Sequence, residues 1–158
     1  MMINALSSSY YSKSDEDKKP HSQEAEDSAI KQAILELEAT DTNVRAHEAA
    51  HIAAGGDVVI GGASFEYTRG PDGKMYAVAG EVPIDTSEAN TPEETVQKAR
   101  QIVAAAMAPA DPSPTDYRVA ATAAMMEMKA SLEISKELRE KNSGIEAYKE
   151  SALESDVA

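Results

Sequence analysis

The sequence contains no cysteine and no tryptophan, and only one of its 158 residues is phenylalanine. Without cysteine there can be neither a disulfide framework nor a thiolate zinc site, so any metal ion must be held by nitrogen and oxygen ligands. With so few aromatic residues, the core must be built from alanine, methionine and the branched aliphatic residues. The length and an apolar content of 42% predict one small domain.

Positive charge and long apolar runs are also scarce. The 15 Lys and Arg residues face 28 Asp and Glu residues, which gives a formal net charge of −13. Binding to nucleic acid or to an anionic membrane requires basic residues that neutralise phosphates, so we expect neither partner. No segment approaches transmembrane length, and membrane insertion is not expected. A basic leader and an apolar signal core are missing from the N-terminus, which makes the cytoplasm the default expected location.

Aliphatic residues are almost absent from the first part of the chain, which is rich in Ser, Asp, Glu and Lys. Such a composition cannot offset the entropy of ordering by burial. We therefore predict a disordered arm at residues 1–25, a single domain at 26–140 and a polar tail at 141–158. His21 falls within the arm and is set aside as a metal ligand.

The most informative segment is His47-Glu48-Ala49-Ala50-His51. On an α-helix, residues four apart lie on the same face, so both imidazoles can reach one ion. Neutral imidazole suits Zn²⁺, and a glutamate next to the first ligand can hold a water molecule without ligating the metal. The pattern predicts His47 and His51 as zinc ligands and Glu48 as a general base.

The surrounding sequence predicts a helix for this motif and a second helix before it. Asp41 or Thr42 can serve as an N-cap, and Gly55-Gly56 supplies a stop signal. Apolar residues at helical spacing between 30 and 37 predict a short preceding helix that ends before Asp41.

After the motif the apolar pattern changes to period two. It predicts strands at 64–69 and at about 74–85, joined by the turn Gly70-Pro71-Asp72-Gly73. Gly80 within the second strand indicates a bulge or a close backbone approach. Capping signals at Thr91-Pro92-Glu93-Glu94 and Ser113-Pro114-Thr115-Asp116 predict two C-terminal helices, to about residues 107 and 138. The predicted fold class is α+β, predominantly helical, with a β-hairpin or small antiparallel sheet.

Several segments, in this order, resemble the SprA-related family of bacterial HExxH proteins. They are Val44-Arg45-Ala46-His47-Glu48-Ala49-Ala50-His51, Ala53-Ala54-Gly55-Gly56, Gly70-Pro71-Asp72-Gly73, Tyr76-Ala77-Val78-Ala79-Gly80-Glu81-Val82-Pro83-Ile84-Asp85 and Ala108-Pro109-Ala110-Asp111-Pro112-Ser113. The resemblance spans about residues 41–130. Ala79 and Pro83 depart from the expected glycine and small polar residue. The resemblance implies a zincin-like domain and a zinc-dependent metalloprotease.

A zinc site needs a third protein ligand, and the sequence leaves several candidates. Glu81 is the first choice, because it lies in a family-like segment on a strand that a hairpin could place beside the motif helix. Asp57 stands at the last ligand position of the extended H-E-x-x-H-x-x-G-x-x-H/D spacing, although Ala54 replaces the glycine of that motif. Asp85 and Glu66 are weaker candidates.

The sequence thus predicts a hydrolase that cleaves a peptide or protein substrate with Zn²⁺ and Glu48. Tyr76, Tyr67 and Arg45 are candidates to stabilise the oxyanion. Two alternatives remain, a catalytically idle zinc-binding module and an acidic helical protein that binds partners without metal. In the metal-free alternative, His47 and His51 are partly buried residues that hydrogen-bond to carboxylates.

Overall fold

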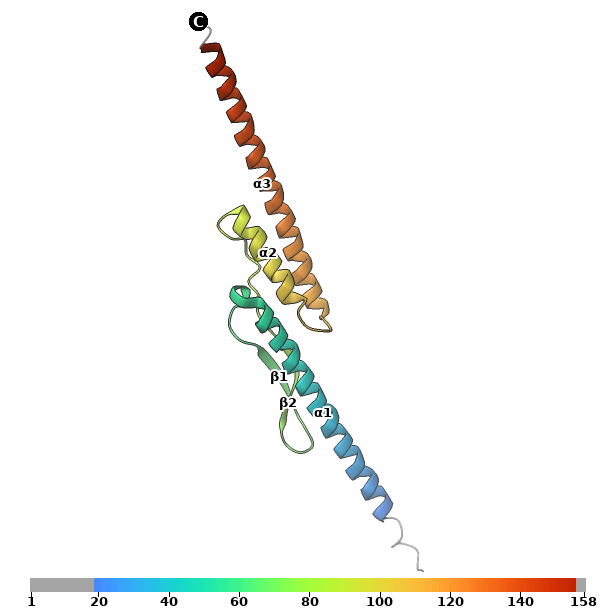
Figure 1. Cartoon of the computed structure of the whole chain (residues 1–158). Helices are drawn as coiled ribbons and strands as arrows, with labels where there is room; N and C mark the ends of the chain where they lie inside the picture. Colours follow the sequence, from blue (N-terminus) through green and yellow to red (C-terminus); the bar gives the residue numbers. More distant parts are fainter. Residues whose placement is uncertain (1–18, 156–158) are drawn as a thin grey trace, which may run out of the picture.

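The computed structural model describes residues 19–155, with side chains over residues 22–146. Its elements are α1 (Lys19–Gly55), the 3₁₀ helix η1 (Gly56–Val58), β1 (Ser64–Arg69), β2 (Met75–Glu81), α2 (Pro92–Ala106) and α3 (Pro114–Ser155). Helices dominate and one two-stranded antiparallel sheet completes the fold, which confirms the predicted α+β class. In Figure 1, α2 lies between α1 and α3, whose far ends project in opposite directions.

The predicted arm and tail fall partly outside this range. Residues 1–18 of the arm and 156–158 of the tail lie outside the described residues, whereas 19–25 belong to α1 and 141–155 to α3. Within the described part of the chain, no helix carries an apolar stretch that could span a bilayer.

The predicted helix boundary at Asp41 is wrong, because α1 continues through it. The Asp41 carboxylate binds the Arg45 guanidinium at 2.9 and 3.0 Å and accepts the Ala77 N–H at 2.7 Å. The Thr42 hydroxyl donates to the Glu38 carbonyl at 2.8 Å. Both capping groups are therefore engaged elsewhere, and no Gly or Pro interrupts the helix here. Asp41 instead attaches α1 to β2.

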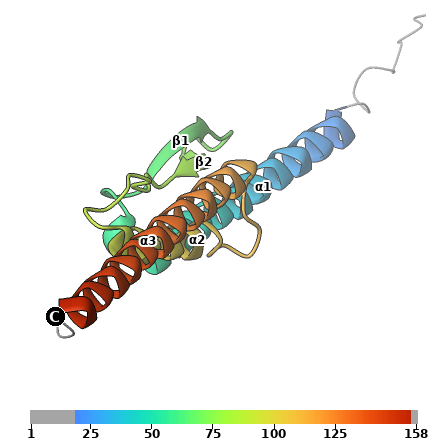
Figure 2. The same cartoon turned by 90° about the horizontal axis from the view of Figure 1, so that it is seen from above.

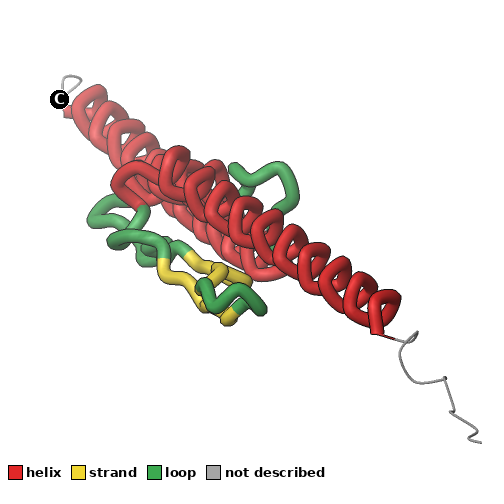
Figure 3. The backbone as a smooth tube through the Cα atoms, turned by 90° about the horizontal axis from the view of Figure 1, so that it is seen from below, coloured by secondary structure: helices red, strands yellow, loops and turns green. Residues whose placement is uncertain are grey.

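The sheet lies along one side of the helices (Figures 2 and 3). Its register shifts between Glu66 and Tyr67, which pair with Ala79 and Ala77 and leave Val78 as an extra residue on β2. The bulge thus lies two residues before Gly80 and breaks the predicted alternation, because the adjacent residues Val78 and Ala79 are both exposed. Beyond β2, the chain pairs with the segment after α1 through a Val59–Ile84 bridge.

The core lies mainly between α2 and α3. Its fully buried members include Ala99, Ile102, Ala105 and Ala123, and Val58 and Met126 complete the cluster. The core is thus built from alanine, methionine and branched aliphatic residues, as the shortage of aromatic residues predicted. The expected start of α2 is confirmed, because Thr91 Oγ1 accepts the Glu94 N–H at 3.2 Å.

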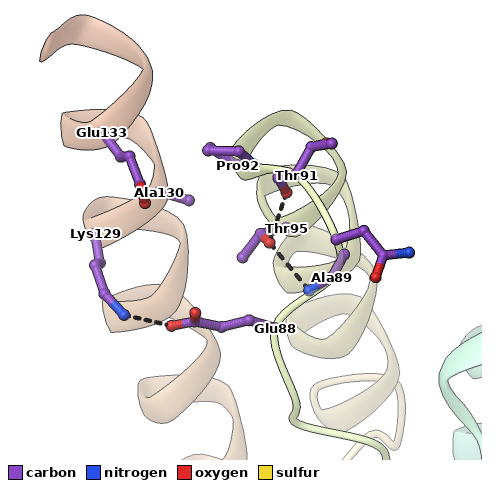
Figure 4. Close-up of a pocket in the computed structure, with 9 residues that line it drawn as sticks. Glu88, Ala89, Thr91, Pro92, Thr95, Lys129, Ala130 and Glu133 are labelled. Carbon is purple, nitrogen blue, oxygen red and sulfur yellow. Dashed lines mark hydrogen bonds and ion pairs between the residues drawn. The ribbon is translucent and has the colours of Figure 1, made fainter. Parts of the chain in front are cut away.

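The loop before α2 is fastened to both C-terminal helices around a cavity of about 150 Å³ (Figure 4). Lys129 Nζ donates to Glu88 Oε1 at 2.7 Å, which joins the loop to α3. The Ala89 N–H donates to Thr95 Oγ1, and that hydroxyl donates to the Thr91 carbonyl. These contacts fix the path of the chain from the sheet to α2.

Candidate metal site

The two motif histidines lie on one face of α1, as their spacing predicted. Their ring centroids are 4.8 Å apart and the rings are tilted by 75°. His51 is buried, whereas His47 is half-buried at the wall of a cavity. The end of α1 is held against α2 by Gln101, whose amide donates to the Gly55 carbonyl at 3.1 Å. The part of α1 that carries both rings is therefore anchored on α2.

Backbone from α2 orients the His51 ring. Nδ1 of His51 lies 2.9 Å from the Ala105 carbonyl oxygen, which can only accept a hydrogen bond. Nδ1 of the neutral ring must therefore carry the proton, and Nε2 is left with a free lone pair. Metal-ligating histidines commonly have their second nitrogen fixed in this way.

Asp116, at the start of α3, meets both histidines. One carboxylate oxygen, Oδ2, lies 3.3 Å from His47 Nε2, and the other, Oδ1, lies 3.4 Å from His51 Nε2. One donor atom from each of the three residues falls within 4.8 Å of the other two, so the cluster could hold a metal ion. Sequence reasoning missed Asp116 as a ligand and treated it only as part of the capping signal of this helix.

That capping interaction holds the carboxylate in place. The Ser113 N–H donates to Asp116 Oδ2 at 2.6 Å, and the Asp116 N–H donates to Ser113 Oγ at 3.2 Å. Burial favours the neutral carboxyl, but the hydrogen bonds from Ser113 and the two nearby histidines outweigh it and keep the pKa of Asp116 below its usual range. The cluster therefore contains an ionised carboxylate. The available signal was the capping turn itself, because the carboxylate of Asp116 can bind a metal ion as well as help to start a helix.

Glu48 is buried beside this cluster, with 3% of its surface exposed. Its Oε2 atom has no hydrogen-bond partner, the only such buried side-chain atom among the residues described. Burial raises the pKa of the Glu48 carboxyl, and the nearby carboxylates of Asp116 and Glu81 act in the same direction, against the two histidines. Glu48 is thus a carboxylate with one oxygen available to a bound molecule.

Gly80 makes this position of Glu48 possible. A Cβ atom on Gly80 would lie 2.8 Å from Glu48 Cγ and 2.9 Å from its Oε1. Real Cβ atoms essentially never approach other atoms so closely. The close backbone approach predicted for Gly80 is confirmed, and the group that it accommodates is the proposed base.

Glu81 lies at the same cavity as the cluster but is not one of its three converging residues. The cavity has a volume of about 340 Å³, and its walls include the histidines, Glu48, Glu81 and Asp116. Glu81 is exposed at the end of β2. Its role as a metal ligand stays a prediction, which Asp116 now rivals.

The other predicted oxygen ligands lie in different surroundings. Asp57 is exposed in η1, and Glu66 is exposed on β1. Asp85 accepts hydrogen bonds from Lys98 Nζ at 2.6 Å and from Ser87, and these bonds hold the pKa of Asp85 far below its usual range. None of these three carboxylates belongs to the converging cluster within the described chain.

The candidate oxyanion-stabilising residues are engaged elsewhere. The Tyr76 hydroxyl donates to Asp72 Oδ2 at 2.8 Å, a bond that raises the pKa of Tyr76 to about 12. Arg45 binds Asp41, and its guanidinium carbon lies 5.0 and 5.8 Å from the ring centroids of Phe65 and Tyr67. These contacts stabilise the hairpin against α1 and do not direct the three side chains into the metal cavity.

The chain was compared with protein-family models, curated proteins and solved structures. The model of the SprA-related family matches residues 10–148, most of the chain. The chain belongs to the SprA-related family. No curated protein and no solved structure matches it.

Three of the segments that carry the SprA-related resemblance lie at or lead into the candidate metal site. The motif helix supplies the histidines and Glu48, and the segment around Gly80 packs on Glu48. The segment that ends at Ser113 leads into the turn that positions Asp116. In this SprA-related chain, three segments far apart in the sequence therefore build one possible metal site.

Proposed function

We propose that this chain is a zinc-dependent hydrolase of peptide bonds, with His47, His51 and Asp116 as zinc ligands and Glu48 as the general base. The observation that carries the proposal is the buried carboxylate of Glu48, whose Oε2 has no hydrogen-bond partner, beside the cluster of histidine nitrogens and Asp116 oxygens. A purely structural metal site would not require Glu48, and burying a carboxylate without a partner for each oxygen is costly.

The donor set of two imidazoles and one carboxylate fits zinc. Zn²⁺ is bound by imidazole and carboxylate at about 2.0–2.2 Å, so two ligand atoms at tetrahedral positions lie roughly 3.3–3.6 Å apart. The His47–Asp116 and His51–Asp116 separations of 3.3 and 3.4 Å end on different carboxylate oxygens, and one donor atom from each residue lies within 4.8 Å of the other two. The three side chains would therefore draw together around a bound ion. Three protein ligands also leave one position open, as a catalytic zinc requires. The His47–Asp116 distance also suits a hydrogen bond, so metal content is the test that separates a zinc site from a hydrogen-bonded pair.

Zinc bound here would polarise a carbonyl group and lower the pKa of a bound water molecule. Oε2 of Glu48 would accept a proton from the attacking water, whose oxygen bonds to the carbonyl carbon. Glu48 would then return that proton to the amine nitrogen as the carbon–nitrogen bond breaks. A pKa raised by burial favours this exchange, because a general base works best when its pKa lies near the operating pH.

The test compares wild type with Glu48→Gln for zinc content and for turnover of a fluorogenic peptide library. Glutamine has the same shape, so we expect zinc to be retained and turnover to fall by about 10²–10⁴-fold. Glu93→Gln, an exposed residue of α2, is the matched control and should change neither quantity. If Glu48→Gln turns over the substrate as fast as wild type, Glu48 is not the general base. A zinc-loaded wild type that cleaves no member of the library would favour the idle zinc-binding module.

A further inference from the structure

Three cavities meet at Gly80. The metal cavity is one, and a second of about 600 Å³ lies between α1, β2 and the loop after α2. A third of about 230 Å³ lies over the paired start of β1 and end of β2. Gly80 lines all three, and Glu48 packs against it where a side chain would otherwise lie. The metal cavity shares His47, Glu48 and Gly80 with the second cavity, and it shares Gly80 and Glu81 with the third. These three neighbouring cavities, with the proposed catalytic centre in the first, are here called the Gly80 groove.

The second cavity, here called the alanine pocket, is walled by small apolar side chains. They are Val44, Ala46, Ala50, Ala79, Pro109 and Ala110. Its volume falls within the range of ligand-binding pockets, and its short side chains leave room for a larger apolar group. His47 and Glu48 line both this pocket and the metal cavity. A side chain in the alanine pocket would therefore belong to a residue next to the reacting bond.

The other end of the groove is acidic. Glu66 and Glu81 line the third cavity, and both are exposed. Within the described chain, neither forms an ion pair or a side-chain hydrogen bond with another residue. The buried, unpaired Oε2 of Glu48 in the wall between the pockets independently indicates that this groove receives a polar molecule.

We propose that the Gly80 groove binds an extended peptide, with a large apolar side chain in the alanine pocket and a lysine or arginine near Glu66 and Glu81. Burial of the apolar side chain supplies the affinity, and the two carboxylates select the cationic side chain. The proposal deepens the proposed function, because it names the substrate class of that same site.

The test measures binding, so that it does not depend on turnover. A positional-scanning peptide library is selected on zinc-loaded Glu48→Gln protein, and the best peptide is labelled for fluorescence anisotropy. We expect selection of leucine or phenylalanine together with lysine or arginine. Replacing the apolar residue by alanine should weaken binding by about tenfold or more.

Matched variants assign each preference to its pocket. Ala46→Leu fills the alanine pocket and should erase the apolar preference, whereas Ala49→Leu, an exposed neighbour on the same helix that lines no cavity described here, should retain it. The double change Glu66→Gln with Glu81→Gln should erase the cationic preference, and Glu93→Gln should not.

The outcomes distinguish the groove from the enzyme. No selected peptide, or an apolar preference that survives Ala46→Leu, would overturn the groove proposal. Selective binding by a protein whose wild type retains zinc but has no turnover would support the groove and reject the peptidase. Turnover by the wild type, without a preference for an apolar or a cationic side chain, would support the peptidase and reject the groove.

Discussion

Asp116, and not Glu81, is expected to be the third metal ligand. The two carboxylates lie at the same cavity, but only Asp116 places its oxygens 3.3 and 3.4 Å from the histidine Nε2 atoms. The perturbation is therefore a pair of isosteric changes, Asp116→Asn and Glu81→Gln, each of which removes one charge. His47→Ala serves as the positive control for loss of a ligand.

The magnitude follows from the number of ligands. Structural zinc sites with four ligands bind with about 10–16 kcal/mol, so one ligand contributes about 2.5–4 kcal/mol. Loss of that amount raises the dissociation constant by about 10²–10³-fold. Asp116→Asn and His47→Ala should both show this loss. Glu81→Gln removes only an exposed charge near the site, and screening by water and salt limits its effect to a few-fold.

The assay is competition against a chromophoric zinc chelator, supported by elemental analysis after dialysis. Asparagine at 116 still offers an oxygen to the Ser113 N–H, so the cap of α3 should survive. Circular dichroism checks this, because an intact helix separates ligand loss from unfolding. Tight zinc binding by Asp116→Asn, together with its loss in Glu81→Gln, would refute the assignment and restore the ligand predicted from the sequence. Absence of zinc from wild type after reconstitution would refute the metal site itself.

Two further predictions concern packing and pH. Gly80→Ala forces a Cβ atom against the buried Glu48 carboxylate, so unfolding experiments should show a loss of about 1–3 kcal/mol. If Glu48 is the base, turnover should fall more than zinc content. Gly62→Ala, where a Cβ meets nothing within 4 Å, is the control and should show neither effect. The Lys98 ammonium keeps the folded pKa of Asp85 below its unfolded value of roughly 3.9, so this pair contributes stability above that pH and loses it as pH falls toward the folded pKa. Asp85→Asn should therefore lower Tm at pH 7, and the difference from wild type should shrink below about pH 4. The exposed Asp57→Asn should show no such pH-dependent difference, and an equal Tm deficit at every pH would contradict the ion-pair explanation.

The sequence determined the local features of this protein. Helix caps, turn residues and apolar periodicity depend on neighbours a few positions away, so the starts of α2 and α3 and the hairpin turn could be predicted. The spacing of His47 and His51 fixed their common face for the same reason. Even the close approach at Gly80 was indicated, because a glycine inside a strand pattern usually has such a cause.

Tertiary structure decided which distant groups meet. Asp41 carries a good capping signal, yet its carboxylate binds Arg45 and the backbone of β2, so the helix passes through without ending. Asp116 looked like a capping residue, and only the packing of α3 on α2, with α1 on the other side, brings its carboxylate to the histidines. Local propensity contributes about 1 kcal/mol per residue or less and carries no information on contacts across 65 or more positions. The motif could therefore be recognised from the sequence, but its partner from another helix required the fold.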